Sequence, residues 1–243
     1  MDESVAVRVR SLRQDGQSPK AIARLLGVGM ADVVGVLNEA VPASALERAD
    51  PRCWVNAGWS RSVGLDDAAQ WAGLDPGASD AEEVRGLVSV LVALESVRSS
   101  RARVAGFLLD VWCLGVKNAL PPESMTTTRL ARHRGEFFSA YEAHVQVPAG
   151  LARALVFGAA DYARSLGFEP EADFEEAAAV LGGPVGRCAI RFGRDGRPFY
   201  VNGPYDDPES VLAALRNAVG EQGFDYSIAF PEQPRSGFVG IGR

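Results

Sequence analysis

Apolar residues in the first forty positions recur at helical spacing in three short runs. The runs span residues 5–12, 21–26 and 30–39. Ser18 is placed to cap the second helix because Pro19 follows it at the first helical position. The glycines after the second run predict a tight turn before the third. Residues 1–40 are therefore expected to form a small three-helix module.

A stretch rich in proline, serine, alanine and charged residues at 41–52 predicts a linker. Beyond it, apolar runs at 87–94 and 104–114 flank a polar turn and predict an antiparallel hairpin. The other expected elements are strands at 53–59 and 224–230, helices at 126–145, 148–166, 173–181 and 208–219, and a hairpin at 187–202. Together they predict an α+β domain with an antiparallel sheet over 53–230, followed by a loose tail at 231–243.

The hairpin at 187–202 has the clearest turn. Asp195-Gly196 is a favoured type I′ pair, in which both central residues take positive φ. This turn would place Phe192 opposite Phe199 on one face of the hairpin. On the other face Arg191 would lie opposite Tyr200, as is common on an exposed sheet surface; the alternative is a sheet that stacks a nucleotide.

The segment SPKAIARLLGVGMADVVGVL resembles a helix-turn-helix of the recombinase or sigma-factor type. Ala23 is small where the two helices would cross, and Gly27 suits a turn that needs positive φ. Val33 and Val36 fall on the inner face of the third helix. The resemblance implies a helix-turn-helix module, and the alternative is two amphipathic helices without that geometry.

The third helix of such modules normally reads bases in the major groove with polar or basic side chains. Here Asn38 is the one outward residue with a suitable group, and no Arg or Lys occurs between Ala31 and Leu46. Basic residues of the first two helices are placed to contact phosphates. The candidate DNA-binding residues are Arg13, Lys20, Arg24 and Asn38.

The same third helix has an apolar outer face, formed by Met30, Ala31 and Val34. Residues 1–40 carry five basic and five acidic residues, so the module is neutral overall. A neutral module with an apolar outer face suits binding to another protein. The sequence leaves duplex DNA and a protein partner open as alternatives.

The whole chain has 243 residues, a formal net charge of −6 and 47% hydrophobic residues, which is typical of a soluble globular protein. Its first residues are acidic where a secretory signal would be basic. The longest apolar stretch, 104–116, contains Asp110 and is too short to span a bilayer. These features predict a cytoplasmic protein with no membrane partner.

Metal and thiol chemistry find little support in the sequence. Cys53, Cys113 and Cys188 are scattered and form no C-x-x-C pair, which favours buried structural thiols over a nucleophile or metal ligand. His133 and His144 would lie about 16 Å apart on one helix, too far to share an ion. No metal site and no cofactor are expected.

Asp110 stands inside the apolar run FLLDVWCLGVKNA, where a carboxylate needs a partner or a shifted pKa. It is either an acid/base group or a member of a structural ion pair with Lys117 or a nearby arginine. With Asp206, these residues are candidates for an enzyme acting on a nucleotide or nucleic-acid phosphate. No common enzyme motif occurs, so the sequence favours a protein without catalytic residues.

Residues 53–230 also resemble a set of bacterial proteins of unknown function, mostly from high-GC organisms. The stretches that carry the resemblance are CWVNAGW, FLLDVWCLGVKNA, YARSLGF and FGRDGRPFYVNGPYDD. The resemblance implies no activity, catalytic residue or cofactor. It implies a histidine shortly after YARSLGFEP, where this chain has Glu171 and Ala172.

The first functional expectation is a DNA-associated bacterial protein, a regulator or recruiting factor, in which a helix-turn-helix is joined to an α+β sensing or interaction domain. The second is an adaptor subunit of a larger assembly, in which the helical module docks protein. The third is the phosphate-directed enzyme.

Overall fold

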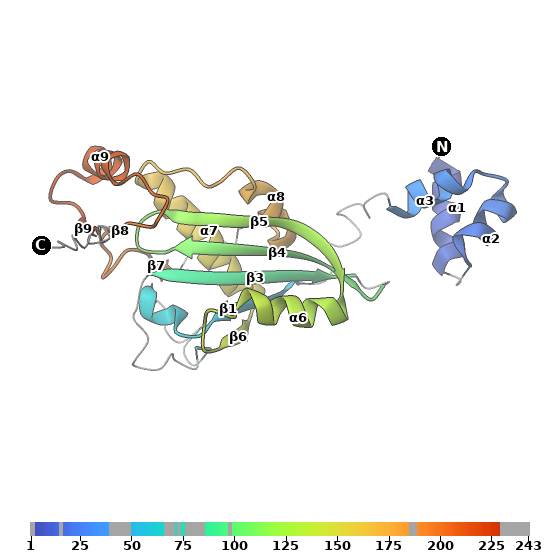
Figure 1. The fold of residues 1–243 in the computed structure, drawn as a ribbon, viewed down its shortest axis with the longest axis horizontal. Coiled ribbons are helices and arrows are strands. Elements are labelled where there is room, and N and C mark those ends of the chain that lie inside the picture. Colours follow the sequence, from blue (N-terminus) through green and yellow to red (C-terminus); the bar gives the residue numbers. More distant parts are fainter. Residues whose placement is uncertain are drawn as a thin grey trace, which may run out of the picture.

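The computed structural model describes residues 3–14, 17–38, 50–65, 71, 74–75, 86–96, 99–184 and 189–228 (Figure 1). Three helices, α1 (Glu3–Gln14), α2 (Pro19–Leu26) and α3 (Met30–Asn38), pack on one another near the N-terminus. Their shared core consists of Val9, Ile22, Val33 and Val36. The predicted three helices are therefore present in the described residues.

Helix α2 begins and ends where its local sequence predicts. The Ser18 hydroxyl accepts a hydrogen bond from the backbone N–H of Ala21 at 3.2 Å, and Pro19 occupies the first helical position. Gly27 ends the helix in the left-handed region, with φ 65°. This residue turns the chain toward α3.

The larger part of the chain is built on a five-stranded antiparallel sheet of order β5-β4-β3-β1-β6. Its strands are β1 (Arg52–Asn56), β3 (Leu87–Glu95), β4 (Arg101–Asp110), β5 (Gly115–Thr126) and β6 (His144–Val147). The predicted hairpin is confirmed, since β3 and β4 pair from Leu87 opposite Asp110 to Glu95 opposite Ala102. The α+β class is confirmed as well.

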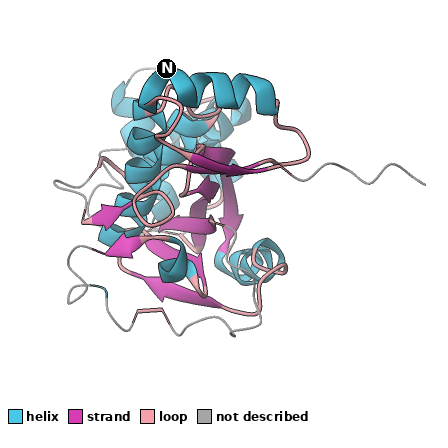
Figure 2. Cartoon of the chain, turned by 90° about the vertical axis from the view of Figure 1, so that its left-hand side faces the viewer, coloured by secondary structure: helices cyan, strands magenta, loops and turns pink. Residues whose placement is uncertain are grey.

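Helices cover both faces of this sheet (Figure 2). Helices α7 (Ala149–Ser165) and α8 (Phe174–Leu181) pack on one face, and α6 (Thr127–Phe137) packs on the other. Side chains of β3 alternate between the two cores: Val88, Val90 and Val92 face α7 and α8, whereas Leu91 and Ala93 face α6. The central strands are therefore apolar on both faces.

The sequence prediction was wrong in two segments between residues 115 and 147. The expected helix at 126–145 ends at Phe137, and the residues from His144 form β6, which pairs with β1 at one edge of the sheet. No element was predicted for residues 115–125, which form nearly all of β5 at the opposite edge. An edge strand tolerates prolines such as Pro121 because one side of its backbone needs no partner. Pairing with distant strands overrode the local pattern in both segments.

The hairpin at 187–202 is only partly formed. Asp195 and Gly196 have φ 55° and 80°, as a type I′ turn requires, and Arg194 bridges to Arg197. The arms then separate. Strand β7 (Ile190–Arg191) pairs with β2 (Gly64–Leu65), and β8 (Phe199–Val201) pairs in parallel with β9 (Asp225–Ser227).

The expected pairs of Phe192 with Phe199 and of Arg191 with Tyr200 are therefore wrong. The arms separate because the turn after β4 lies between them. The N–H of Gly193 donates to Val111 O at 2.9 Å, and the N–H of Phe199 donates to Trp112 O at 3.1 Å.

Helix α9 (Pro208–Val219) agrees with its predicted bounds. Asp207 caps it by accepting hydrogen bonds from the N–H groups of Glu209 and Ser210. Its Leu212 and Leu215 pack on a small core with Tyr200. None of the described helices combines the length and apolar character needed to cross a bilayer.

Candidate functional site

Two of the four candidate DNA-binding residues, Lys20 and Arg24, are exposed on α2. They are one helical turn apart, so their cations project from the same side of the helix. Arg13 and Asn38 belong to α1 and α3, and their side chains lie outside the described part of the structure.

The candidate docking face of α3 is exposed at its first two residues, Met30 and Ala31. The side chain of Val34 lies outside the described residues. Two large apolar side chains that the sequence did not single out are also exposed, Leu25 of α2 at 63% and Val7 of α1 at 59%. The module thus carries exposed cations and exposed apolar groups.

Asp110 is buried at the end of β4. Its Oδ1 accepts hydrogen bonds from the backbone N–H groups of Trp112 and Cys113, each at 3.0 Å. Burial raises the pKa of Asp110 to about 6, although these hydrogen bonds and the charge of Lys117 act against that rise. The carboxyl group therefore stabilises the turn between β4 and β5, which is the structural alternative for this residue.

Lys117 and Asp206 form a partly buried ion pair near that turn. The Nζ of Lys117 lies 3.0 Å from each carboxylate oxygen of Asp206. Asp206 also accepts a hydrogen bond from the N–H of Gly203 at 2.7 Å. The structure thus brings Lys117 near both Asp110 and Asp206, but uses their carboxylates to hold backbone segments in place.

Cys113 is fully buried beside these charges, and burial raises the pKa of its thiol. Burial also raises the pKa of Tyr162, and it raises that of Tyr200 to about 12, with Asp206 adding to the effect. Cys53 is likewise buried, and burial raises its pKa to about 12. Cys53 and Cys113 are confirmed as buried thiols, which are poor nucleophiles when protonated; Cys188 lies outside the described residues.

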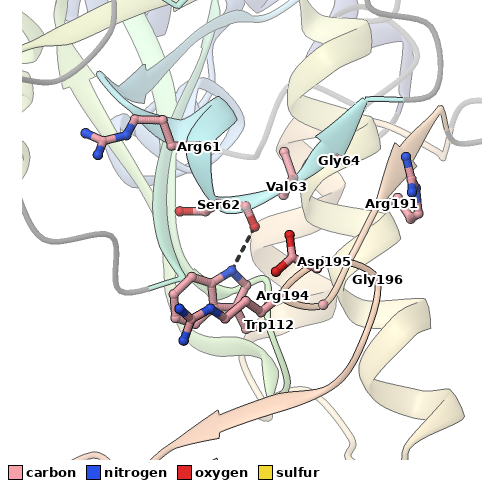
Figure 3. Close-up of a pocket in the computed structure, with 10 residues that line it drawn as sticks. Arg61, Ser62, Val63, Gly64, Trp112, Arg191, Arg194, Asp195 and Gly196 are labelled. Atoms are coloured by element: carbon pink, nitrogen blue, oxygen red, sulfur yellow. Dashed lines mark hydrogen bonds between the residues drawn. The ribbon is translucent and has the colours of Figure 1, made fainter. Parts of the chain in front are cut away.

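A cavity of about 400 Å³ lies between the residues that follow β1 and the Asp195-Gly196 turn (Figure 3). One wall is the segment Arg61–Gly64, which includes the end of the 3-10 helix η1 (Trp59–Ser62) and the start of β2. The opposite wall comes from the arm and turn that carry Arg191, Arg194 and Asp195. Among the described residues, three arginines and one aspartate therefore line the same hollow.

Trp112 joins the two walls of this cavity. Its indole N–H donates to the backbone oxygen of Ser62 at 3.0 Å, as the dashed line in Figure 3 marks, and its ring meets Phe199 edge to face at 5.5 Å. The guanidinium of Arg194 lies over both rings, 5.5 Å from the centroid of Trp112 and 4.7 Å from that of Phe199. Arg194 is thus held in position by aromatic contacts.

The sequence did not predict this cavity. The one local signal is the placement of arginines on both sides of the Asp195-Gly196 turn, and the expected hairpin assigned Arg191 to a cross-strand pair instead. In the structure Arg191 lies against Gly64, where a β-carbon would be only 3.2 to 3.3 Å from the arginine side chain. The pairing of β2 with β7 creates the cavity, and these strands are far apart in the chain.

No group of three His, Cys, Asp or Glu within the described residues is arranged to hold a metal ion. His144 stacks on Phe138 with ring centroids 4.8 Å apart, and burial lowers its pKa. The chain matches no protein-family model, no curated protein and no solved structure.

Proposed function

We propose that this protein associates with duplex DNA through α2 and α3, and that its α+β domain is the sensing or interaction part. One observation carries the proposal: Ile22 and Val33 are fully buried between these helices, and Gly27 turns the chain at φ 65°. A helix-turn-helix needs this combination of a left-handed turn residue and an apolar inner face. The resemblance of residues 18–37 to recombinase and sigma-factor modules gives further support.

The exposed residues predict the character of this binding. Lys20 and Arg24 supply cations for phosphate contacts from α2. Met30 and Ala31 at the start of α3 have no groups that hydrogen-bond to base edges, so base reading depends on Asn38. We therefore expect modest affinity, strong dependence on salt and weak discrimination between sequences.

Fluorescence anisotropy of the full chain with a short labelled duplex of random sequence, measured over a salt series, tests the proposal. Lys20→Gln and Arg24→Gln should each reduce the slope of log affinity against log salt by about 1. Arg216→Gln removes an exposed arginine from α9 and is the matched control, with an unchanged slope expected. Failure of the unaltered protein to bind the duplex even at low salt would rule the proposal out.

A second candidate is the adaptor function, which the exposure of Met30 (44%) and Leu25 (63%) favours. Affinity purification from the native host, with nuclease treatment, compares the unaltered chain with Met30→Glu and with Tyr205→Glu as a matched exposed control. A protein that survives nuclease and is lost with Met30→Glu alone supports docking through α3. Identical protein recovery from all three chains counts against it.

A further inference from the structure

The cavity between Arg61–Gly64 and the Asp195-Gly196 turn is rich in arginine. The described residues that line it include three arginines, Arg61, Arg191 and Arg194, and one carboxylate, that of Asp195 (Figure 3). Guanidinium groups bind phosphate and carboxylate oxygens through paired N–H donors. We propose that this cavity binds a small phosphate-bearing molecule.

Arg194 is the central residue of the proposed site. Its guanidinium is positioned over Trp112 and Phe199, at 5.5 and 4.7 Å from their ring centroids. Among the described residues, no carboxylate is within ion-pair distance of Arg194. Because the side chain is already ordered by the two rings, a ligand that binds it loses little additional side-chain entropy.

Arg61 and Arg191 contribute in a different way. Each has a further interaction within the chain, so the inference depends on their charge and on their place in the cavity wall. Charges that line a hollow raise the local concentration of oppositely charged ligands. The side chain of Arg191 lies along Gly64, with its Nε and Nη2 only 3.3 Å from the place of a β-carbon, so any larger residue at position 64 would displace it.

The size and lining of the cavity indicate the class of ligand. A volume of about 400 Å³ is within the range of small-molecule sites and exceeds what a single inorganic phosphate needs. Trp112 is 6% exposed and its ring lies under Arg194, so the cavity offers little aromatic surface for stacking a base. Recognition should therefore depend on the phosphate group much more than on the organic part.

Isothermal titration of the full chain with AMP, adenosine and inorganic phosphate tests the inference. AMP should bind and adenosine should not, because adenosine lacks the charged group. Inorganic phosphate that binds as tightly as AMP would identify the phosphate as the whole recognition element, and weaker binding would show a contribution from the organic part. Failure of both AMP and inorganic phosphate to bind overturns the inference.

Two substitutions of opposite effect locate the site. Arg194→Gln should weaken AMP binding by about tenfold or more, since it removes a charge-assisted contact. Asp195→Asn removes the one carboxylate among the described lining residues and should tighten binding by about threefold or more. Asparagine suits the positive φ of this turn, so Asp195→Asn should fold normally.

Arg216→Gln, on the exposed surface of α9, is the matched control and should leave AMP affinity unchanged. The inference is independent of DNA binding, so Arg24→Gln should also leave AMP affinity unchanged. Equal AMP affinity in the unaltered chain, Arg194→Gln and Asp195→Asn would place any binding elsewhere and overturn the inference.

Discussion

The carboxyl group of Asp110 lies inside the protein at the end of β4, where burial disfavours its charged form. Its pKa is raised from 3.8 to about 6, so the folded protein binds a proton more readily than the unfolded chain between these values. The contribution of Asp110 to the free energy of unfolding is therefore fully present below pH 4, and it is lost as the pH rises through 6.

This behaviour predicts the effect of Asp110→Asn, which keeps a side-chain oxygen as acceptor for the N–H groups of Trp112 and Cys113. The variant cannot titrate, so it should lose the pH dependence contributed by this carboxyl group. The free energy of unfolding of the unaltered chain, relative to the variant, should rise by about 2 kcal/mol between pH 7 and pH 4. Urea unfolding across this pH range measures the difference.

Asp161→Asn is the control for that experiment, because Asp161 is an exposed carboxylate of α7. Its profile should remain nearly parallel to that of the unaltered chain. If the profile of Asp110→Asn were equally parallel, Asp110 would not titrate in the folded protein as described.

The cysteines allow a second residue-scale prediction. With its pKa raised to about 12 by burial, Cys53 carries about one part in ten thousand of thiolate at pH 8. Iodoacetamide should therefore leave Cys53 and Cys113 unmodified in the folded protein and label both in urea, as mass spectrometry of peptides would measure. Rapid labelling of either thiol in the folded state would contradict their burial.

At the scale of elements, the close approach of β5 to α7 depends on Gly115. Gly115 has φ 70°, and a β-carbon there would lie 2.4 Å from the β-carbon of Ala163 and 2.8 Å from the carbonyl oxygen of Ala159. The left-handed backbone and the missing side chain are both required. This contact holds the end of the β4–β5 turn against the helix.

Gly115→Ala should therefore destabilise the protein by about 2–4 kcal/mol, through backbone strain and overpacking. Gly150→Ala is the matched control, because no atom lies within 4 Å of a β-carbon placed there in α7. That second change should raise stability by about 0.5 kcal/mol through helix propensity. Thermal unfolding of both variants measures the contrast, and equal effects would refute the role given to Gly115.

At the scale of the whole molecule, the ion pair of Lys117 and Asp206 joins β5 to the loop that precedes α9. Only 21% of the lysine side chain and 13% of the aspartate side chain are exposed, so the loss of one partner leaves a poorly solvated charge. Lys117→Met should therefore lower the free energy of unfolding by about 2 kcal/mol.

A double-mutant cycle separates the pair from other effects. Asp206→Asn should cost less in the Lys117→Met background than alone, with an interaction energy of about 1 kcal/mol or more. The exposed pair of Arg216 and Glu221 provides the comparison, and Arg216→Gln should change stability by less than about 0.5 kcal/mol. Strict additivity of the Lys117 and Asp206 substitutions would show that their ion pair adds nothing to stability.

The sequence by itself determined the elements whose signals are local. Ser18 with Pro19, Asp207 with Pro208, and Asp195-Gly196 act through hydrogen bonds and backbone angles within a few residues, so the starts of α2 and α9 and the type I′ turn were predicted correctly. Strands β3 and β4 were also predicted, because two long apolar runs close together in the chain pair readily.

Only the tertiary structure decided the partners of the remaining segments. Strands β5 and β6 form because the edges of a sheet assembled from distant residues accept them, and the arms of the expected hairpin separate around Val111 and Trp112. The arginine-lined cavity exists only once β2 pairs with β7. Such pairings depend on the energy of the whole assembled sheet. The local spacing of residues along the chain therefore does not show which strands pair.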